Sequence, residues 1–132
     1  MTDRKPRVLA TRHFPQDVET RLAANFDARL NAGLLLVRAN RPQEALEHFA
    51  EALRLNPESA AAHFNLGKAF ASLARPADAI PHFEAAARRM PDNAQIYAQL
   101  ARALAAVGRA ADAHTAYARA RQLDASLPPA DF

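Results

Sequence analysis

Side chains that could bind a metal are few in this sequence. The chain has five histidines and no cysteine, so any metal site would depend on imidazole and carboxylate ligands. His48 and His82 are 34 residues apart, but no cluster of carboxylates accompanies them to complete a set of three or four ligands. We therefore predict solvent-exposed histidines at these two positions and no metal site.

Residue types used in catalysis also lack partners. Ser59, Ser72 and Ser126 have no matching histidine and aspartate, and none lies at a predicted turn from strand to helix. Glu47 and Glu51 are one helical turn apart, as on an ordinary solvated helix surface. The three glycines are too widely spaced for a Gly-x-Gly-x-x-Gly phosphate loop. The sequence predicts no catalytic residue, no cofactor and no enzymatic function.

The chain is organised around a repeat with a period of 34 residues. Phe49, Phe83 and Tyr117 occupy the same place in successive copies. The other matching sets are Ala45 with Ala79 and Ala113, Ala52 with Ala86 and Ala120, Gly33 with Gly67 and Ala101, and Pro57 with Pro91. A period near 34 is typical of stacked helical hairpins, in which small residues let the helices approach closely.

This pattern resembles the tetratricopeptide repeat family, which has Leu-Gly and aromatic residues in the first helix, Ala and Phe in the second, and a closing Pro. The middle copy has His63 at the first aromatic place, then Leu66, Gly67, Phe70, Ala79, Phe83, Ala86 and Pro91. The resemblance implies an all-α fold, a right-handed superhelical array of antiparallel helix pairs. We predict three repeats, at residues 26–59, 60–93 and 94–127, and a packed, neutral ring at His63.

Residues 1–25 form a predicted leader. A β-favouring run at residues 7–11 precedes an amphipathic helix over residues 16–25. A break between this helix and the first repeat is predicted near Asp27, acting as an N-cap. The first repeat is apolar nearly all round at residues 34–37, so we expect the leader helix to cover it as a front cap.

Residues 4–31 have a second resemblance. The string PRVLATRHFPQDVETRLAANFDARLN is similar to the start of the D-2-hydroxyacid dehydrogenases, especially glyoxylate reductase-like members. In that family the segment forms the first strand and helix of the substrate domain. The glycine loop and the later Arg, Glu and His of such enzymes have no counterpart here, so no catalytic residue is carried over. Chance likeness, a natural fusion and a constructed fusion are the open explanations.

Residues 128–132 form a predicted tail. Repeat arrays usually end in a helix with a polar outer face, and none follows Asp124. The last layer is therefore predicted to stay partly exposed, to pair with a second copy, or to be covered by the tail through Leu127 and Phe132. Pairing gives an alternative function, that of a self-associating structural homodimer that uses an uncapped C-terminal layer.

The family resemblance also implies a binding surface, because the first helices of tetratricopeptide repeats line a concave groove. The residues predicted to contact a partner there are Leu30, Leu34, Arg38, Phe64, Asn65, Lys68, Gln95, Gln99 and Arg102. The amides of Asn65 and Gln99 suit a peptide backbone, and Lys68 and Arg102 favour acidic groups. Only Asn65 agrees with the carboxylate clamp that binds chaperone tails, so such tails are not the expected ligand.

Composition limits the other function classes. The 132 residues are half apolar, and the net charge of +3 comes from 17 basic and 14 acidic residues. These charges form no basic stripe, which excludes the usual nucleic-acid surface. The sequence has no apolar run long enough to span a membrane and no secretory signal. We predict a cytoplasmic, non-catalytic module that binds a protein or peptide, and the arginine and alanine bias suggests a GC-rich bacterial genome.

Overall fold

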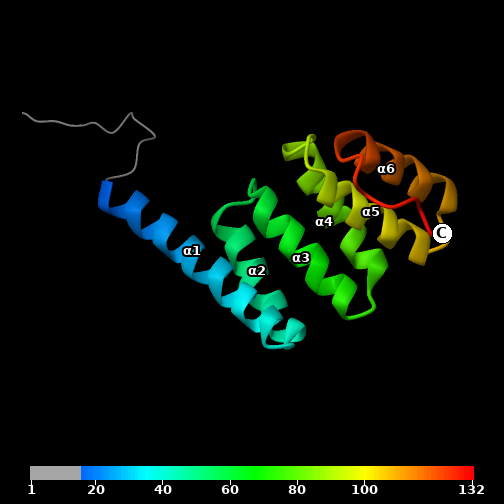
Figure 1. Ribbon diagram of the computed structural model, residues 1–132. Helices are drawn as coiled ribbons and strands as arrows, with labels where there is room; N and C mark the ends of the chain where they lie inside the picture. Colours follow the sequence, from blue (N-terminus) through cyan, green and yellow to red (C-terminus); the bar gives the residue numbers. More distant parts are fainter. Residues whose placement is uncertain (1–15) are drawn as a thin grey trace, which may run out of the picture.

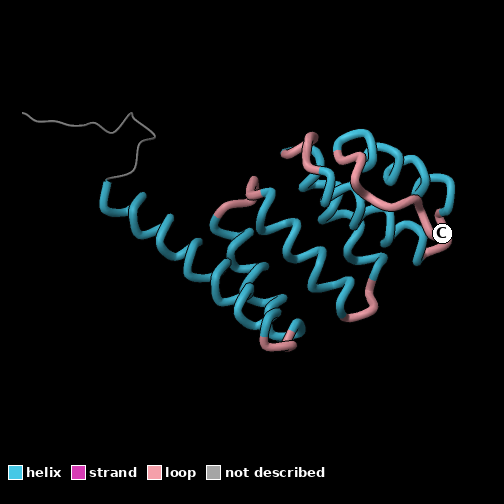
Figure 2. The backbone as a smooth tube through the Cα atoms, in the orientation of Figure 1, coloured by secondary structure: helices cyan, strands magenta, loops and turns pink. Residues whose placement is uncertain are grey.

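The computed structural model describes residues 16–132, which form six α-helices joined by short turns (Figures 1 and 2). The helices are α1 (Gln16–Arg38), α2 (Pro42–Leu55), α3 (Ala60–Ser72), α4 (Pro76–Arg89), α5 (Ala94–Ala106) and α6 (Ala110–Leu123). They form three stacked hairpins, which confirms the predicted all-α repeat array. The β-favouring run at residues 7–11 lies outside the described residues. No helix in the described range is long and apolar enough to cross a membrane.

Local chemistry that recurs between repeats sets the helix boundaries. Ser59 caps α3, since its hydroxyl accepts a hydrogen bond from the backbone N–H of Ala62. The side chain of Asn93 caps α5 in the same way. Pro42 and Pro76 open α2 and α4, where the missing amide hydrogen has no partner within the helix. The helix starts are therefore encoded independently of the tertiary packing.

The turn inside each hairpin contains one residue with a left-handed backbone. Asn40, Ala74 and Gly108 occupy this place in the three repeats, with φ values of 60°, 57° and 84°. Glycine adopts this conformation freely and asparagine tolerates it, whereas the Cβ of alanine crowds the neighbouring carbonyl. Ala74 is thus the least favourable of the three residues for its backbone.

Close packing within the first two hairpins depends on an aromatic ring that faces a glycine. Phe49 and Phe83 are fully buried. A Cβ atom placed on Gly33 would lie 2.4 Å from the ring of Phe49, and one placed on Gly67 would lie 2.7 Å from the ring of Phe83. Each ring therefore fills the space beside the backbone of the first helix, as the small residues at these places predicted.

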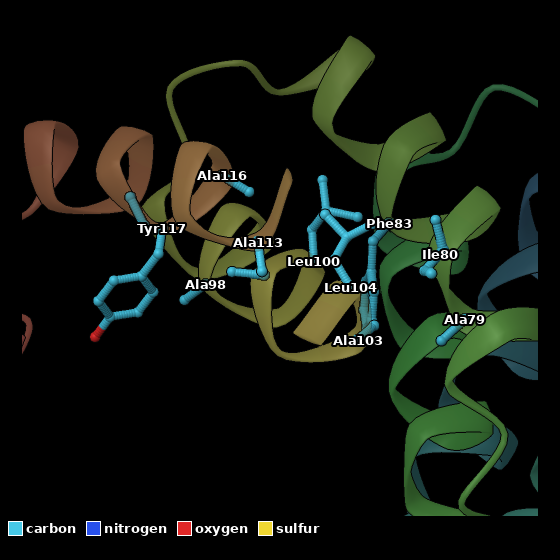
Figure 3. Close-up of a cluster of buried hydrophobic side chains, with 12 residues drawn as sticks. Ala79, Ile80, Phe83, Ala98, Leu100, Ala103, Leu104, Ala113, Ala116 and Tyr117 are labelled. Carbon is cyan, nitrogen blue, oxygen red and sulfur yellow. The ribbon is translucent and has the colours of Figure 1, made fainter. Parts of the chain in front are cut away.

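The hydrophobic core is larger toward the C-terminal end of the array. One buried cluster joins α4, α5 and α6 and includes Phe83, Leu100, Leu104 and Tyr117 (Figure 3). The other cluster joins α2 and α3 and contains Ala45, Phe49, Leu66 and Ala69. Partly buried leucines of α1 pack against this second cluster on its N-terminal side. The first repeat is consequently held by fewer fully buried side chains than the third.

Successive first helices lie closer together than successive second helices. Cα atoms of α3 lie within 8 Å of Cα atoms in both α1 and α5, whereas in the described chain no Cα atom of α4 lies this close to α2 or α6. The array therefore curves toward α1, α3 and α5, which form its inner side. This curvature places the predicted groove helices on one face.

The predicted leader helix forms, but as part of α1 and not as a separate helix. α1 is one helix of 23 residues, against 13 in α3 and in α5, so the break near Asp27 and the front cap were wrong predictions. Pro57 and Pro91 precede α3 and α5, but Ala23 stands at the equivalent place, and alanine continues a helix. Because nothing folds back over the front within the described residues, Leu35 is 62% exposed.

The C-terminal tail covers part of the last layer. Leu127 and Phe132 pack against the larger core cluster. The hydroxyl of Tyr117 donates a hydrogen bond to the carbonyl of Pro128 at 2.7 Å, and the rings of Tyr117 and Phe132 meet edge to face. Of the three outcomes predicted for this layer, the structure shows coverage by the tail. The part of the C-terminal layer beneath Leu127 and Phe132 is thus not exposed, and pairing of this layer with a second copy stays a prediction.

We expect Ala79→Leu to lower the free energy of unfolding by about 1–3 kcal/mol, because Ala79 is fully buried and added methylenes force its neighbours to move. Urea unfolding followed by circular dichroism measures this loss. Ala77→Leu on the exposed side of the same helix is the matched control and should leave the midpoint nearly unchanged. Equal midpoints for the two variants would contradict close packing at this crossing.

We expect Ala74→Gly to raise the free energy of unfolding by about 0.5–1 kcal/mol, because glycine relieves the left-handed strain at this turn. Ala71→Gly, inside α3 and three residues earlier, should instead lower it by about 1 kcal/mol. The two thermal midpoints should therefore move in opposite directions. A shift of both in the same direction would show that the turn is not strained.

Candidate partner-binding groove

The concave face is formed by the groove-side residues of α1, α3 and α5. None of the nine residues predicted to bind a partner is fully buried. The exposed members are Arg38, Lys68, Gln95 and Arg102, and the half-buried members are Leu30, Leu34, Phe64, Asn65 and Gln99. All nine can therefore be reached from solvent.

The floor of the concave face is apolar at its N-terminal end. Leu30 and Leu34 pack against the smaller core cluster with one side and face solvent with the other. Phe64 continues this floor on α3, where its ring lies 5.8 Å from that of Phe83. These side chains are thereby fixed by the core, so a partner that contacts them loses little of their side-chain freedom.

Two cations stand at the same repeat position on the concave face. The ammonium of Lys68 lies 5.3 Å from the centre of the Phe64 ring, which holds the charge above an apolar surface. Arg102 occupies the equivalent place on α5 and is exposed. In the described part of the chain, no carboxylate forms an ion pair with either side chain. Both charges are thus available to an acidic partner.

Carboxylates are absent from most of the inner helices. α3 and α5 contain no acidic residue, and α1 contains none after Asp27. At the start of each second helix, arginine pairs with a carboxylate three residues later: Arg41 with Glu44, Arg75 with Asp78, and Arg109 with Asp112. These exposed pairs each contribute about 0–1 kcal/mol. These pairs were not predicted, although the spacing of arginine and a carboxylate three residues later repeats every 34 residues in the sequence.

A cleft of about 420 Å³ adjoins the concave face between α5 and the turn that joins α3 to α4. It is lined by Ala71, Ala74, Pro76, Gln99, Arg102, Ala103 and Ala106. Small apolar side chains form most of its wall, while Gln99 and Arg102 supply its polar groups. The sequence predicted these two residues but not the cleft, because the contribution of the turn depends on how the helices pack.

The amide residues differ in their availability. The Nδ2 of Asn65 donates a hydrogen bond to the carbonyl of Ala61 in its own helix at 2.9 Å, which leaves Oδ1 and one amide hydrogen for a partner. Gln95 lines a separate hollow, formed with the α4–α5 turn and Asp124. The structure therefore brings Gln99 and Arg102 together but places Gln95 in a different depression.

Three of the histidines lie away from the concave face. His48 is half-buried, and its Nδ1 lies 3.4 Å from a guanidinium nitrogen of Arg29. The Nδ1 atoms of His63 and His82 are 3.2 Å apart, and the His82 ring also stacks on Phe70. The predicted packing of His63 is confirmed, whereas the exposure predicted for His48 and His82 is not. In residues 16–132, no three side chains are grouped to hold a metal ion.

With both rings neutral, the contacts of the His63–His82 pair assign one arrangement of protons. His63 Nε2 donates to the carbonyl of Pro57 at 3.1 Å, so its Nδ1 accepts a hydrogen bond from the Nδ1–H of neutral His82. Protonation of both rings would place two hydrogens between the facing nitrogens. Burial lowers the pKa of His82, the neighbouring His63 lowers it further, and Asp78 opposes both effects.

We expect the free energy of unfolding to fall as the pH drops below about 6.5, the unperturbed histidine pKa. The lowered pKa of His82 means that the unfolded chain binds more protons than the folded chain between the two pKa values, so acid favours unfolding. His82→Asn should reduce this pH dependence in urea unfolding between pH 7.5 and 5.5. The control His48→Asn keeps the pair and should retain the dependence; identical pH profiles for the two variants would contradict the assignment.

Comparison with family models identifies the repeat unit. Residues 30–94 match a model described as tetratricopeptide repeat, and residues 72–129 match a second model with the same description. The two matches overlap in the middle repeat and together span residues 30–129. No curated protein sequence matches the chain.

Solved structures of the same fold support this match. A mutant of MamA is 25% identical with a TM-score of 0.72, and the alignment covers 76% of this chain and 73% of that one. YrrB, described as a TPR protein with an unusual peptide-binding site, is 22% identical with a TM-score of 0.73 over 77% of this chain and 53% of YrrB. The chain thus spans about half of YrrB.

A third structure is the type III secretion chaperone SycD of Yersinia enterocolitica, in complex with a peptide of the translocator YopD. It is 17% identical with a TM-score of 0.70, and the alignment covers 86% of this chain and 82% of SycD. At this identity the likeness establishes the fold alone. None of these matches supports the dehydrogenase resemblance of residues 4–31.

Proposed function

We propose that this chain, which belongs to the tetratricopeptide repeat family, is a non-catalytic interaction module whose concave face binds a protein or peptide with acidic groups. The observation that carries this proposal is the pair of exposed cations, Lys68 and Arg102, on helices that contain no carboxylate. Charge-assisted hydrogen bonds from these groups favour carboxylates over neutral side chains.

The apolar surfaces beside the cations define the rest of the ligand. Lys68 lies next to Phe64, and Arg102 borders the small-residue cleft. An extended peptide with acidic side chains and small or medium apolar side chains would satisfy both surfaces. The Oδ1 and the remaining amide hydrogen of Asn65, together with the side-chain amide of Gln99, would hydrogen-bond to the peptide backbone. At the front, Leu30 and Leu34 would receive an apolar anchor.

Two proteins of the same fold support peptide binding as a general use of such an array. The description of YrrB names a peptide-binding site, and the SycD structure contains a bound peptide. We take from them only that a curved array of helix pairs offers a surface long enough for a peptide. The acidic character of the ligand is inferred from the residues of this chain.

The combined change Lys68→Glu and Arg102→Glu should raise the Kd for the natural partner at least about tenfold, since two charge-assisted contacts become repulsive. The partner is first captured from an extract of the source cell and identified by mass spectrometry. Its binding to the intact chain and to the variant is then titrated by calorimetry at two salt concentrations. The affinity of the intact chain should fall at the higher salt concentration.

The matched control is Arg88→Glu with Arg121→Glu, which makes the same change in net charge on exposed positions of α4 and α6. This control should bind as the intact chain does, and circular dichroism should show that all three proteins are equally helical. Equal affinity of the groove variant and the control would place the binding surface elsewhere on the molecule.

A further inference from the structure

One apolar face of α1, at the N-terminal end of the array, is exposed at four of its five residues, and the fifth, Ala32, is half-buried. It consists of Ala24, Ala28, Ala32, Leu35 and Ala39, which lie along one side of α1 and its C-terminal extension; we term it the leading face. Leu35 is 62% exposed, the highest exposure among the exposed large hydrophobic residues of the described chain. The leading face is distinct from the concave face.

The internal repeats show what covers the equivalent faces of α3 and α5. Leu66 and Ala69 of α3 are 5% and 0% exposed, because they are buried against α2. Leu100 and Ala103 of α5 are 8% and 4% exposed, because they are buried against α4 (Figure 3). In both cases the cover is the second helix of the preceding repeat. The leading face of α1 lacks such a helix within the described residues.

The order of large and small residues is reversed on the leading face. Ala32 stands where the other repeats have Leu66 and Leu100, and Leu35 stands where they have Ala69 and Ala103. The surface of α2 is complementary to a helix face on which a leucine is followed, one turn later, by an alanine. On α1 the same helix would meet Leu35 where it needs a small residue. A helix that packs on the leading face must instead have small residues opposite Leu35, so that the leucine side chain has room.

The leading face of a second copy has small residues at the required place. If two α1 helices pack antiparallel about a twofold axis near residues 31 and 32, Leu35 of each copy lies opposite Ala28 of the other. Ala24 then lies opposite Ala39, and the two Ala32 residues approach the axis. Alanines let the helices pack closely, and each leucine fills the space over the facing alanine. The face is therefore complementary to itself.

The opposite end of the array does not compete for the leading face. A second copy bound head to tail would have to place α6 against α1, but Leu127 and Phe132 already cover part of that end. Head-to-tail contact also repeats without closing, whereas the twofold arrangement closes after two copies. We propose that the leading face of α1 binds the leading face of a second copy of this chain, which forms a twofold antiparallel dimer.

The contact runs from Ala24 to Ala39, about 22 Å of helix at 1.5 Å per residue. A contact of one helix with another is at the low end of the area that stable interfaces bury. The dimer should therefore dissociate on dilution, with a Kd on the order of micromolar. Because the concave faces are left uncovered, the dimer carries two binding surfaces for partners.

Sedimentation of the full chain from about 1 to 200 μM, a range chosen around a micromolar Kd, should show a monomer–dimer equilibrium. Leu35→Glu should raise the dimer Kd at least about tenfold, because it places a charge in an apolar contact. The control Val107→Glu changes another exposed apolar residue, 37% exposed, at the end of α5 and should leave the equilibrium unchanged. Circular dichroism checks that each variant remains helical.

Cross-linking provides a second test, because the chain has no cysteine of its own. Ala32→Cys should form an intermolecular disulfide under mild oxidation, since it lies near the proposed axis, whereas Ala118→Cys on the exposed side of α6 should not. A monomer at all concentrations would overturn the proposal. A dimer that Leu35→Glu leaves intact would overturn it as well, and so would cross-linking of the Ala118→Cys variant without cross-linking of the Ala32→Cys variant.

Discussion

The contact between an aromatic ring and a small residue determines the geometry of each hairpin. Phe49 and Phe83 occupy the space where a side chain on Gly33 or Gly67 would be, so the two helices of each pair approach closely. Between hairpins, successive first helices lie closer together than successive second helices, which gives the array its curvature. The concave face exists because the first helices are the ones held close together. Binding at that face therefore depends on packing behind it.

Most of the fold was predictable because the repeat encodes the same local choices more than once. Proline at the start of α2 and α4, and the polar caps of α3 and α5, can be read directly from the sequence. The exception is the front of the chain, where the break near Asp27 was predicted from the family pattern. Ala23 stands where the other repeats have a proline that ends the preceding segment. Because alanine does not interrupt a helix, α1 continues through Asp27 despite the family pattern.

The candidate site was only partly predictable. Repeat spacing placed Lys68 and Arg102 on the inner helices, and their exposure agrees with that placement. The cleft beside Arg102 could not be predicted, since Ala74 and Pro76 reach it only through the path of the turn. The stacking of His82 on His63 was also not predicted, because the two residues occupy different positions in the repeat. Predicting a contact between residues at different repeat positions requires knowing how far one helix is shifted along the other, and the sequence alone does not give this shift.

The uneven core gives the array a gradient of local stability. Fully buried side chains are concentrated in α4, α5 and α6, and the front of α1 is the most solvated part of the described chain. Transient opening should therefore begin at the first repeat and spread toward the tail. A contact formed by α1 with another molecule would stabilise the end that opens most readily. Resistance of this chain to proteolysis would then rise with protein concentration, although no residue in the larger core cluster changes its environment.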